Sequence, residues 1–199
     1  MHFRCLQLKT DLKYFRTAAI LFFVDIIRST AIRPIIPRTE NGIVYRGLDR
    51  HFLKAAFSLY SELNSGESLP WSRRLFYHLF GRRMAFVATI DERVVGIAFY
   101  CFKMRDIKAN TVHSSFSGVS PAFQGKGIGT EMRRSAMLHF FKNGVSGYSS
   151  RISLSNTYSM RASLKLGFRP VEKYYDKQKG EERCYMLAFF DETVGKDEK

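Results

Sequence analysis

Apolar residues recur along the chain at two spacings, and each spacing predicts one kind of secondary structure. From Ile128 to Phe140 they recur every four residues, which is typical of the buried face of an α-helix. Short β-branched and aromatic runs at 84–90 and 94–104 flank the polar residues 91–93, which predicts a strand hairpin. Helices interleaved with strands predict an α/β (α+β) fold with a mixed sheet.

The same patterns give approximate bounds for each element from residue 43 onward. The expected strands are 43–46, 84–90, 94–104, 110–119, 148–154, 169–175 and 183–190, and the expected helices are 49–63, one opening at Pro70, 130–143 and 156–166. In the helix after Pro70, the spacing of Trp71, Leu75 and Leu79 predicts its buried stripe.

The first 40 residues are predicted to form a helical extension followed by a linker that contains Pro34 and Pro37. The apolar helical positions are Leu12, Phe15, Ala19, Phe22, Phe23 and Ile26. The apolar run 18–24 is far shorter than the ~20 residues that span a bilayer, so we expect no transmembrane segment. The helix is expected to pack on the domain or on a partner subunit; a membrane-surface helix is the alternative. The main domain is expected over 41–190 and a polar tail over 191–199.

Charge and cysteine content narrow the class of protein only partly. A net charge of +14 favours an anionic ligand, partner or surface without choosing among them. The three cysteines, Cys5, Cys101 and Cys184, are far apart, which predicts neither a disulfide framework nor a zinc site and fits a reducing cytoplasm. The five histidines show no metal-ligand spacing, so no metal is expected.

A glycine-rich turn lies between the strand ending at Val119 and the helix that follows. Gly125, Gly127 and Gly129 alternate there with two other residues, which is typical of a turn that brings backbone N–H groups against a phosphate at a helix N-terminus. A Walker loop would continue Gly-Lys-Ser/Thr, but Lys126 is followed by glycine. A Rossmann motif would show an acidic residue about 20 positions later, and residues 143–150 contain none.

Two motifs together carry a family resemblance. The stretch Val119-x-Pro121-x-x-Gln124-Gly125-Lys126-Gly127-Ile128-Gly129 closely resembles the acetyl-CoA pyrophosphate loop of the GCN5-related N-acetyltransferases (GNAT). The stretch Asn156-x-x-Ser159-x-x-Ala162-Ser163-x-Lys165-Leu166-Gly167-Phe168 resembles the later motif of that family. The resemblance covers residues 43–190. It implies a mostly antiparallel sheet of six to seven strands, splayed in the middle, and acetyl transfer from acetyl-CoA to a primary amine in a ternary complex.

The resemblance also implies which residues hold the donor. The implied donor site consists of Ser117, Gly118 and Val119 on the strand, Gln124, Gly125, Lys126, Gly127, Ile128, Gly129 and Thr130 in the turn, and Asn156. The strand residues would bind the pantetheine arm and polarise the thioester carbonyl, and the turn would bind the pyrophosphate. The side chains of Lys126, Arg133 or Arg134 could also meet phosphates, although the two arginines could equally be solvated helix charges.

The sequence departs from the family at the proton donor. The residue seven positions after the motif asparagine is often a tyrosine that protonates the CoA thiolate, and here it is Ser163. Another group could act, such as Tyr158, Tyr174 or Tyr175, or the thiolate could leave unassisted. His113 is the candidate base, with a satisfied strand histidine as the alternative, and the weaker candidates are Glu67, His78, Asp91 and Glu92.

The acceptor side is the least defined. The candidate residues are Trp71, Arg73, Arg74, Phe76, Tyr77, His78, Arg82 and Arg83. Aromatic and arginine side chains together suit an anionic small-molecule amine such as a nucleotide-linked amino sugar. Alternatively, the aromatics are core and the arginines are exposed. A homodimer is compatible with the sequence. No nucleic-acid motif is present, but a basic binding module for nucleic acid or membrane, or a degenerate CoA-binding subunit, stays open.

Overall fold

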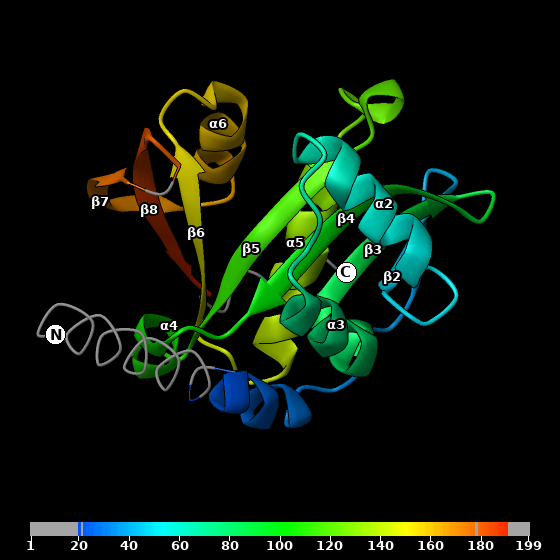
Figure 1. Ribbon diagram of the computed structural model, residues 1–199, viewed down its shortest axis with the longest axis horizontal. Coiled ribbons are helices and arrows are strands. Elements are labelled where there is room, and N and C mark those ends of the chain that lie inside the picture. The colour runs from blue at the N-terminus through cyan, green and yellow to red at the C-terminus, as the bar shows by residue number, and fades with distance from the viewer. Residues whose placement is uncertain (1–19, 21, 178, 191–199) are drawn as a thin grey trace, which may run out of the picture.

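The chain folds around one open sheet with the strand order β1-β2-β3-β4-β5-β6-β8-β7 (Figure 1). This computed structural model describes residues 20, 22–177 and 179–190. The strands are β1 (Arg38–Glu40), β2 (Ile43–Gly47), β3 (Ala85–Ile90), β4 (Arg93–Cys101), β5 (Thr111–Val119), β6 (Gly147–Ser153), β7 (Arg169–Asp176) and β8 (Glu181–Phe189). The labelled helices are α2 (Leu53–Leu63), α3 (Trp71–Met84), α4 (Met104–Lys108), the 3-10 turn η1 (Pro121–Phe123), α5 (Ile128–Lys142) and α6 (Thr157–Lys165).

The sheet splays between β5 and β6. These are its one parallel pair, and they are paired only from Thr111 to Ser114 on β5. Beyond that point β5 continues along β4 while β6 continues along β8, and Figure 1 shows the two strands diverging from a shared base. The mixed, mostly antiparallel and splayed sheet is therefore confirmed. It has eight strands rather than six or seven, because residues 38–40 pair with β2 as an edge strand.

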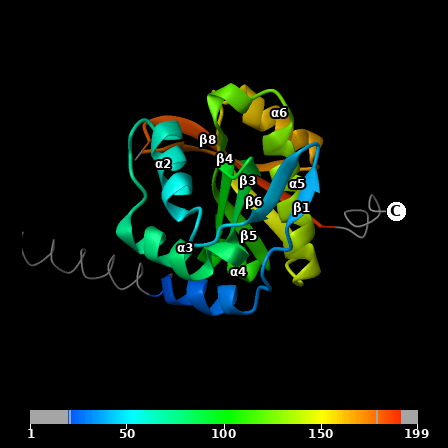
Figure 2. The same cartoon turned by 90° about the vertical axis from the view of Figure 1, so that its right-hand side faces the viewer.

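Helices cover both faces of the sheet. In Figure 2, α2 and α3 lie on one side of the strands and α5 and α6 on the other. The predicted stripe of α5 is confirmed, because Ile128, Met132, Ala136 and Phe140 are all buried. This stripe faces the sheet, where α5 contacts β3, β4, β5 and β6, so the helix holds a fixed position against the strands.

The predicted buried stripe of α3 is wrong. Trp71, Leu75 and Leu79 are exposed by 77%, 43% and 57%, whereas the face around Phe76 is buried. The reason is the close approach at Gly81, where an added Cβ would lie 2.5 Å from the carbonyl oxygen of Leu48. This contact, which comes from another part of the chain, turns the Gly81 side of the helix inward.

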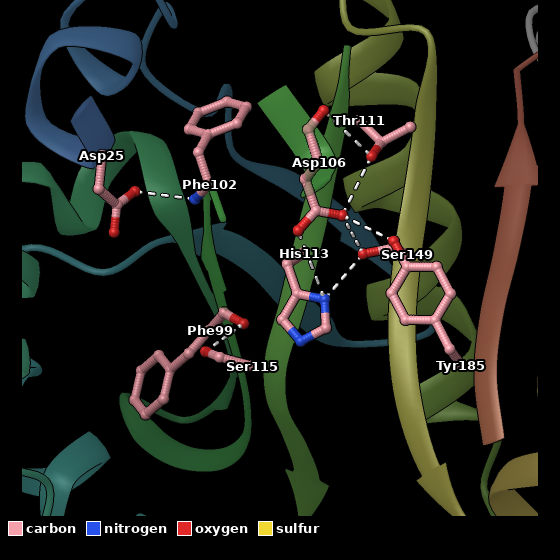
Figure 3. A network of polar contacts seen from close by, with 9 residues as sticks. All are labelled: Asp25, Phe99, Phe102, Asp106, Thr111, His113, Ser115, Ser149 and Tyr185. Carbon is pink, nitrogen blue, oxygen red and sulfur yellow. Dashed lines mark hydrogen bonds and ion pairs between the residues drawn. The ribbon is translucent and has the colours of Figure 1, made fainter. Parts of the chain in front are cut away.

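The strand expected over 94–104 ends early and is followed by the short helix α4, which was not predicted. The last pair of the β4–β5 ladder joins Cys101 to His113. The next backbone N–H, that of Phe102, donates instead to Oδ1 of Asp25 at 2.8 Å (Figure 3). A side chain 77 residues away thus takes the place of a strand partner.

The described part of the N-terminal extension packs on the domain, one of the alternatives above. Residues 22–30 are helical, and the fully buried Asp25 pairs with Arg73 at 2.5 Å. Burial raises the pKa of Asp25, and the charge of Arg73 opposes the shift. Arg83 donates to the carbonyl oxygens of Thr30 and Ile32.

The predicted helical positions Leu12, Phe15 and Ala19 lie outside the described residues, and so does the predicted tail 191–199. Within the described residues, no helix combines the length and the apolar character that crossing a membrane requires.

Burial of His139 makes stability depend on pH. Burial lowers its pKa to about 4, against the smaller opposing effect of its hydrogen bond with the Arg83 carbonyl oxygen. The unfolded chain takes up a proton below about pH 6.5 and the folded chain does not, so stability is lost as pH falls through that value. Between about pH 7 and pH 5 this histidine should account for ~2 kcal/mol of lost unfolding free energy. Urea unfolding should show a shallower pH dependence for His139→Asn, and His78→Asn, at an exposed position, is the control. An unchanged pH slope in His139→Asn would contradict this assignment.

Candidate active site

A groove of about 540 Å³ occupies the splay between β5 and β6. Its walls come from β5, the glycine turn, the first turns of α5 and the start of α6. The lining residues are Leu63, Phe116, Ser117, Gly118, Val119, Phe123, Gln124, Gly125, Gly127, Ile128, Gly129, Thr130, Arg133, Asn156, Tyr158, Ser159 and Ala162. Residues from α2, β5, the glycine turn, α5 and α6 therefore meet at the point where the sheet opens.

The glycine turn presents a helix N-terminus to the groove. Gly127 is the N-cap of α5 in the left-handed conformation with φ +77°, and Gly125 has the same φ. Gln124 closes the turn by donating from Nε2 to the Val119 carbonyl oxygen at 3.0 Å. The first amides of a helix have no intrahelical acceptors, and they lie at the positive end of the helix dipole. This end of the groove is therefore suited to an anionic group such as a diphosphate.

The wall opposite α6 is the outer part of β5. Ser117, Gly118 and Val119 line the groove, and among the described residues no strand pairs with this stretch on the β6 side. Backbone N–H and C=O groups on such an edge can bind an extended ligand as an added strand would bind. The edge thus continues the groove from the anion-binding end toward the base of the splay.

Helix α6 closes the groove from the other side. Asn156 caps it, with Oδ1 accepting a hydrogen bond from the Ser159 backbone N–H at 2.9 Å. Ser163 lies one helical turn beyond Ser159 and is buried. Its hydroxyl oxygen accepts a hydrogen bond from Nη1 of Arg133 at 3.2 Å. Nη2 of the same arginine donates to Ser159 Oγ at 2.9 Å. Helices α5 and α6 are therefore joined across the groove by one guanidinium.

The family assignment follows from a sequence comparison. The model of the acetyltransferase (GNAT) family matches residues 53–168. The chain belongs to the GNAT family. The matched region contains both the glycine turn and the Asn156 motif, so the family resemblance inferred from these two motifs is confirmed. A search among curated proteins finds no match.

Solved structures share the GNAT fold at low sequence identity. The ribosomal-protein-S18-alanine N-acetyltransferase of Escherichia coli is 20% identical, with 74% of this chain and 93% of that chain covered and a TM-score of 0.58. An acetyltransferase of Salmonella typhimurium with acetyl-CoA is 21% identical, with 76% and 96% covered and a TM-score of 0.65. Arabidopsis thaliana NAA60 in complex with acetyl-CoA is 12% identical, with 74% and 99% covered and a TM-score of 0.65. At these identities the similarity supports the fold alone.

Nearly all residues expected to hold the donor meet at the groove of this GNAT protein. Lys126 is the exception, because its ammonium group lies 5.2 Å from the ring centre of Phe123 and the residue is not part of the lining. Of the two arginines expected near phosphates, Arg133 lines the groove. Arg134 is more than half exposed and lies 3.9 Å from Glu131.

His113, the candidate base, lies outside the groove lining. It is buried in a polar network with Asp106, Ser149 and Tyr185 (Figure 3). Ser149 gives its one proton to Asp106 Oδ1, so its oxygen accepts from His113 Nδ1 at 2.7 Å and the lone pair of the ring resides on Nε2. Burial, and then the charges of Lys103 and three arginines, lower the pKa of His113 well below its usual range. His113 is therefore a neutral, hydrogen-bonded strand histidine.

The candidate tyrosines lie in different places. Tyr158 lines the groove and is 68% exposed. Tyr174 is on β7, outside the lining, with the guanidinium of Arg151 5.9 Å from its ring centre. Its hydroxyl oxygen is buried and has no hydrogen-bond partner among the described residues. The structure does not bring Tyr158, Tyr174 and His113 together at one point.

Two arginines of α3 bind the N-terminal segment. Arg73 pairs with Asp25, and Arg83 binds carbonyl oxygens of the N-terminal segment. Phe76 and Tyr77 are core residues, whereas Trp71 is exposed. The proposed combination of aromatic and arginine side chains on α3 is thus divided between the core, the N-terminal segment and the surface.

Sequence reasoning missed several wall residues of the groove. They are Leu63, Phe116, Phe123, Ser159 and Ala162. The positions of Ser159 and Ala162 could have been found, because both stand in the Asn156 motif and, three residues apart on α6, share one helical face. The position of Leu63 at the end of α2 carries no local signal.

Across residues 20, 22–177 and 179–190, the structure has no group of three or more His, Cys, Asp or Glu side chains that could hold a metal ion.

Proposed function

We propose that this GNAT protein transfers the acetyl group of acetyl-CoA to a primary amine by direct attack within a ternary complex. The observation that carries the proposal is the groove itself. A helix N-terminus with two left-handed glycines lies at one end, and beside it runs a stretch of β5 that no described strand pairs on the β6 side. A diphosphate followed by an extended pantetheine arm has this arrangement of charge and backbone-binding groups.

The residues have distinct roles in this proposal. The main-chain amides from Gly125 to Thr130 bind the diphosphate, and the backbone of Ser117 to Val119 binds the pantetheine arm. Asn156, which lines the groove as the α6 cap, contacts the arm from the opposite wall. A β5 amide directed at the thioester carbonyl would stabilise the charge that develops on its oxygen when the amine attacks. Holding both reactants in one groove supplies much of the rate acceleration.

Among the residues expected to move protons, the geometry favours Tyr158. Its side chain lines the groove, whereas His113 and Tyr174 do not. His113 keeps Nε2 unprotonated at neutral pH, so its action as a base would require the acceptor amine or a water molecule to reach Nε2, the ring nitrogen that does not bond Ser149. These assignments are tested by whether Tyr158→Phe, His113→Asn or Tyr174→Phe lowers kcat.

For the acceptor we propose an anionic small-molecule amine, of which a nucleotide-linked amino sugar is one example. The net charge of +14 supports this class by favouring the approach of anions. Arg73 and Arg83 add nothing to it, because Asp25 and the N-terminal carbonyls already engage them.

CoA release measured with a panel of amines tests both parts of the proposal. We expect turnover with acetyl-CoA, and faster turnover with anionic amines than with peptide or polycationic amines. Activity confined to peptide or polycationic amines would overturn the acceptor class and leave acetyl transfer intact. CoA binding without turnover on any amine would favour a degenerate subunit, and salt-sensitive nucleic-acid binding without CoA binding would favour a binding module.

A further inference from the structure

Arg133 lies where the sequence departs from its family. Its guanidinium contacts Ser163, the residue that stands in place of the tyrosine that often protonates the CoA thiolate. The short serine side chain leaves room for the guanidinium and accepts one of its hydrogen bonds. A second hydrogen bond to Ser159 fixes the group in orientation. The arginine of α5 thus lies next to position 163 of α6, where other members of the family often carry the tyrosine.

The charge of Arg133 is not neutralised within the described part of the chain. Both of its hydrogen-bond partners are neutral hydroxyls, and no described carboxylate forms an ion pair with it. Neighbouring Arg134, by contrast, lies near Glu131. A guanidinium has five N–H donors, so donors remain after the two serine contacts. A half-buried, unpaired cation that lines a groove is suited to an anion inside that groove.

The guanidinium of Arg133 lies closer to the end of the groove where the thioester would react than to the end where the diphosphate would bind. Burial raises the pKa values of the tyrosine hydroxyls of Tyr100 and Tyr148, and the charge of Arg133 opposes both shifts. These two hydroxyls lie 3.1 Å apart on β4 and β6, flanking the paired base of β5. Residue 133 is also six residues beyond the N-cap Gly127, about 9 Å along the axis of α5.

We propose that Arg133 is a catalytic residue that stabilises the departing CoA thiolate by its charge. The inference rests on the proposed function and adds a leaving-group role to the same groove. The amine nitrogen forms a bond to the thioester carbonyl carbon, and the carbon–sulfur bond breaks with its electron pair on sulfur. The proton of the amine passes to solvent. The sulfur leaves as a thiolate beside the guanidinium, so the bond breaks without an acid at position 163, and Tyr158 or solvent protonates the thiolate afterwards.

The charge predicts a measurable change in CoA itself. A thiol beside an arginine has a lowered pKa, so the thiol of bound CoA should titrate about one unit below the thiol of free CoA. The thiolate absorbs in the ultraviolet, so titrating the CoA complex reads this pKa without any amine acceptor. Arg133→Met removes the charge, and Arg133→Gln removes it while retaining an amide for the two serines. Arg161→Met, at an exposed position of α6 outside the groove, is the matched control.

In both neutral Arg133 variants we expect the thiol pKa of bound CoA to return to that of free CoA, with the Arg161→Met control unchanged from wild type. We expect kcat to fall by about 10- to 100-fold, the loss of one charge-assisted interaction, while KM for acetyl-CoA changes by less than about 3-fold.

Three results would overturn the inference. One is a thiol pKa that is the same in wild type and Arg133→Gln. Another is a loss of affinity for acetyl-CoA and CoA with kcat unchanged, which would make Arg133 a phosphate ligand. Failure of the wild type to bind CoA would overturn the proposed function and this inference with it.

Discussion

Replacing Gly127 by valine is expected to weaken CoA binding by about 100-fold or more. Gly127 is the N-cap of α5 with φ +77°, a conformation that costs a residue with a Cβ about 1–2 kcal/mol and a β-branched residue more. Relief of that strain would rotate the first amides of α5 away from the groove. Loss of one charge-assisted hydrogen bond to the diphosphate adds about 1.5–3 kcal/mol. Together these terms reach about 3 kcal/mol, or roughly 100-fold in Kd.

The control for this substitution is Gly144→Val. Gly144 follows the other end of α5 with φ +75°, has no atom within 4 Å of an added Cβ, and lies outside the groove. The backbone strain is therefore matched, and thermal unfolding should show similar losses of stability in the two variants. Calorimetric titration with CoA should show lost affinity only in Gly127→Val. Equal CoA affinities in the two variants would show that the glycine turn does not bind CoA.

Replacing Asp106 by alanine is expected to lower the free energy of unfolding by about 3–5 kcal/mol. The carboxylate is 1% exposed, and its Oδ1 accepts from Thr111, Ser149 and Tyr185 at 3.1, 2.5 and 3.0 Å (Figure 3). Removing the carboxylate leaves three buried hydroxyls without their hydrogen-bond acceptor. Each unsatisfied group lowers the free energy of unfolding by about 1–3 kcal/mol. Urea denaturation monitored by circular dichroism would measure the loss.

Glu172→Ala is the comparison for Asp106→Ala. Glu172 pairs at 2.7 Å with Arg105, the residue next to Asp106, but both side chains are 51% exposed. Exposed pairs of this kind contribute about 0–1 kcal/mol, so little stability should be lost. Asp106→Asn, which keeps one carbonyl oxygen as acceptor, should lie between the two. If Asp106→Ala lost no more stability than Glu172→Ala, the network would not be a stabilising element of the fold.

Features that depend on neighbours along the chain could be predicted before any contact was known. The α5 stripe follows from spacing, because residues four apart share one face of a helix. The glycine turn follows from conformation, because positions 125 and 127 have φ values that only glycine adopts readily. Asn156 likewise caps α6 through a bond to a residue three positions on.

The inward face of α3 could not be predicted in the same way. Trp71, Leu75 and Leu79 have helical spacing, and so does the set that is actually buried. Gly81 decides between them by contacting Leu48, and that contact exists only once the helix has packed. The early end of β4 has a similar cause, because Asp25 binds the Phe102 amide from 77 positions away.

The sequence by itself determined the interleaved α/β order, the glycine turn and the two motifs of the GNAT family, because each rests on residues a few positions apart. Only the tertiary structure decided that His113 is enclosed by Asp106 and Ser149 and that Arg133 reaches Ser163 across 30 positions. Those contacts join different strands and helices, and no local spacing specifies which distant side chain will meet which. The residues that line the candidate donor groove were therefore largely predictable, whereas the contacts behind the proposed leaving-group role of Arg133 exist only in the folded chain.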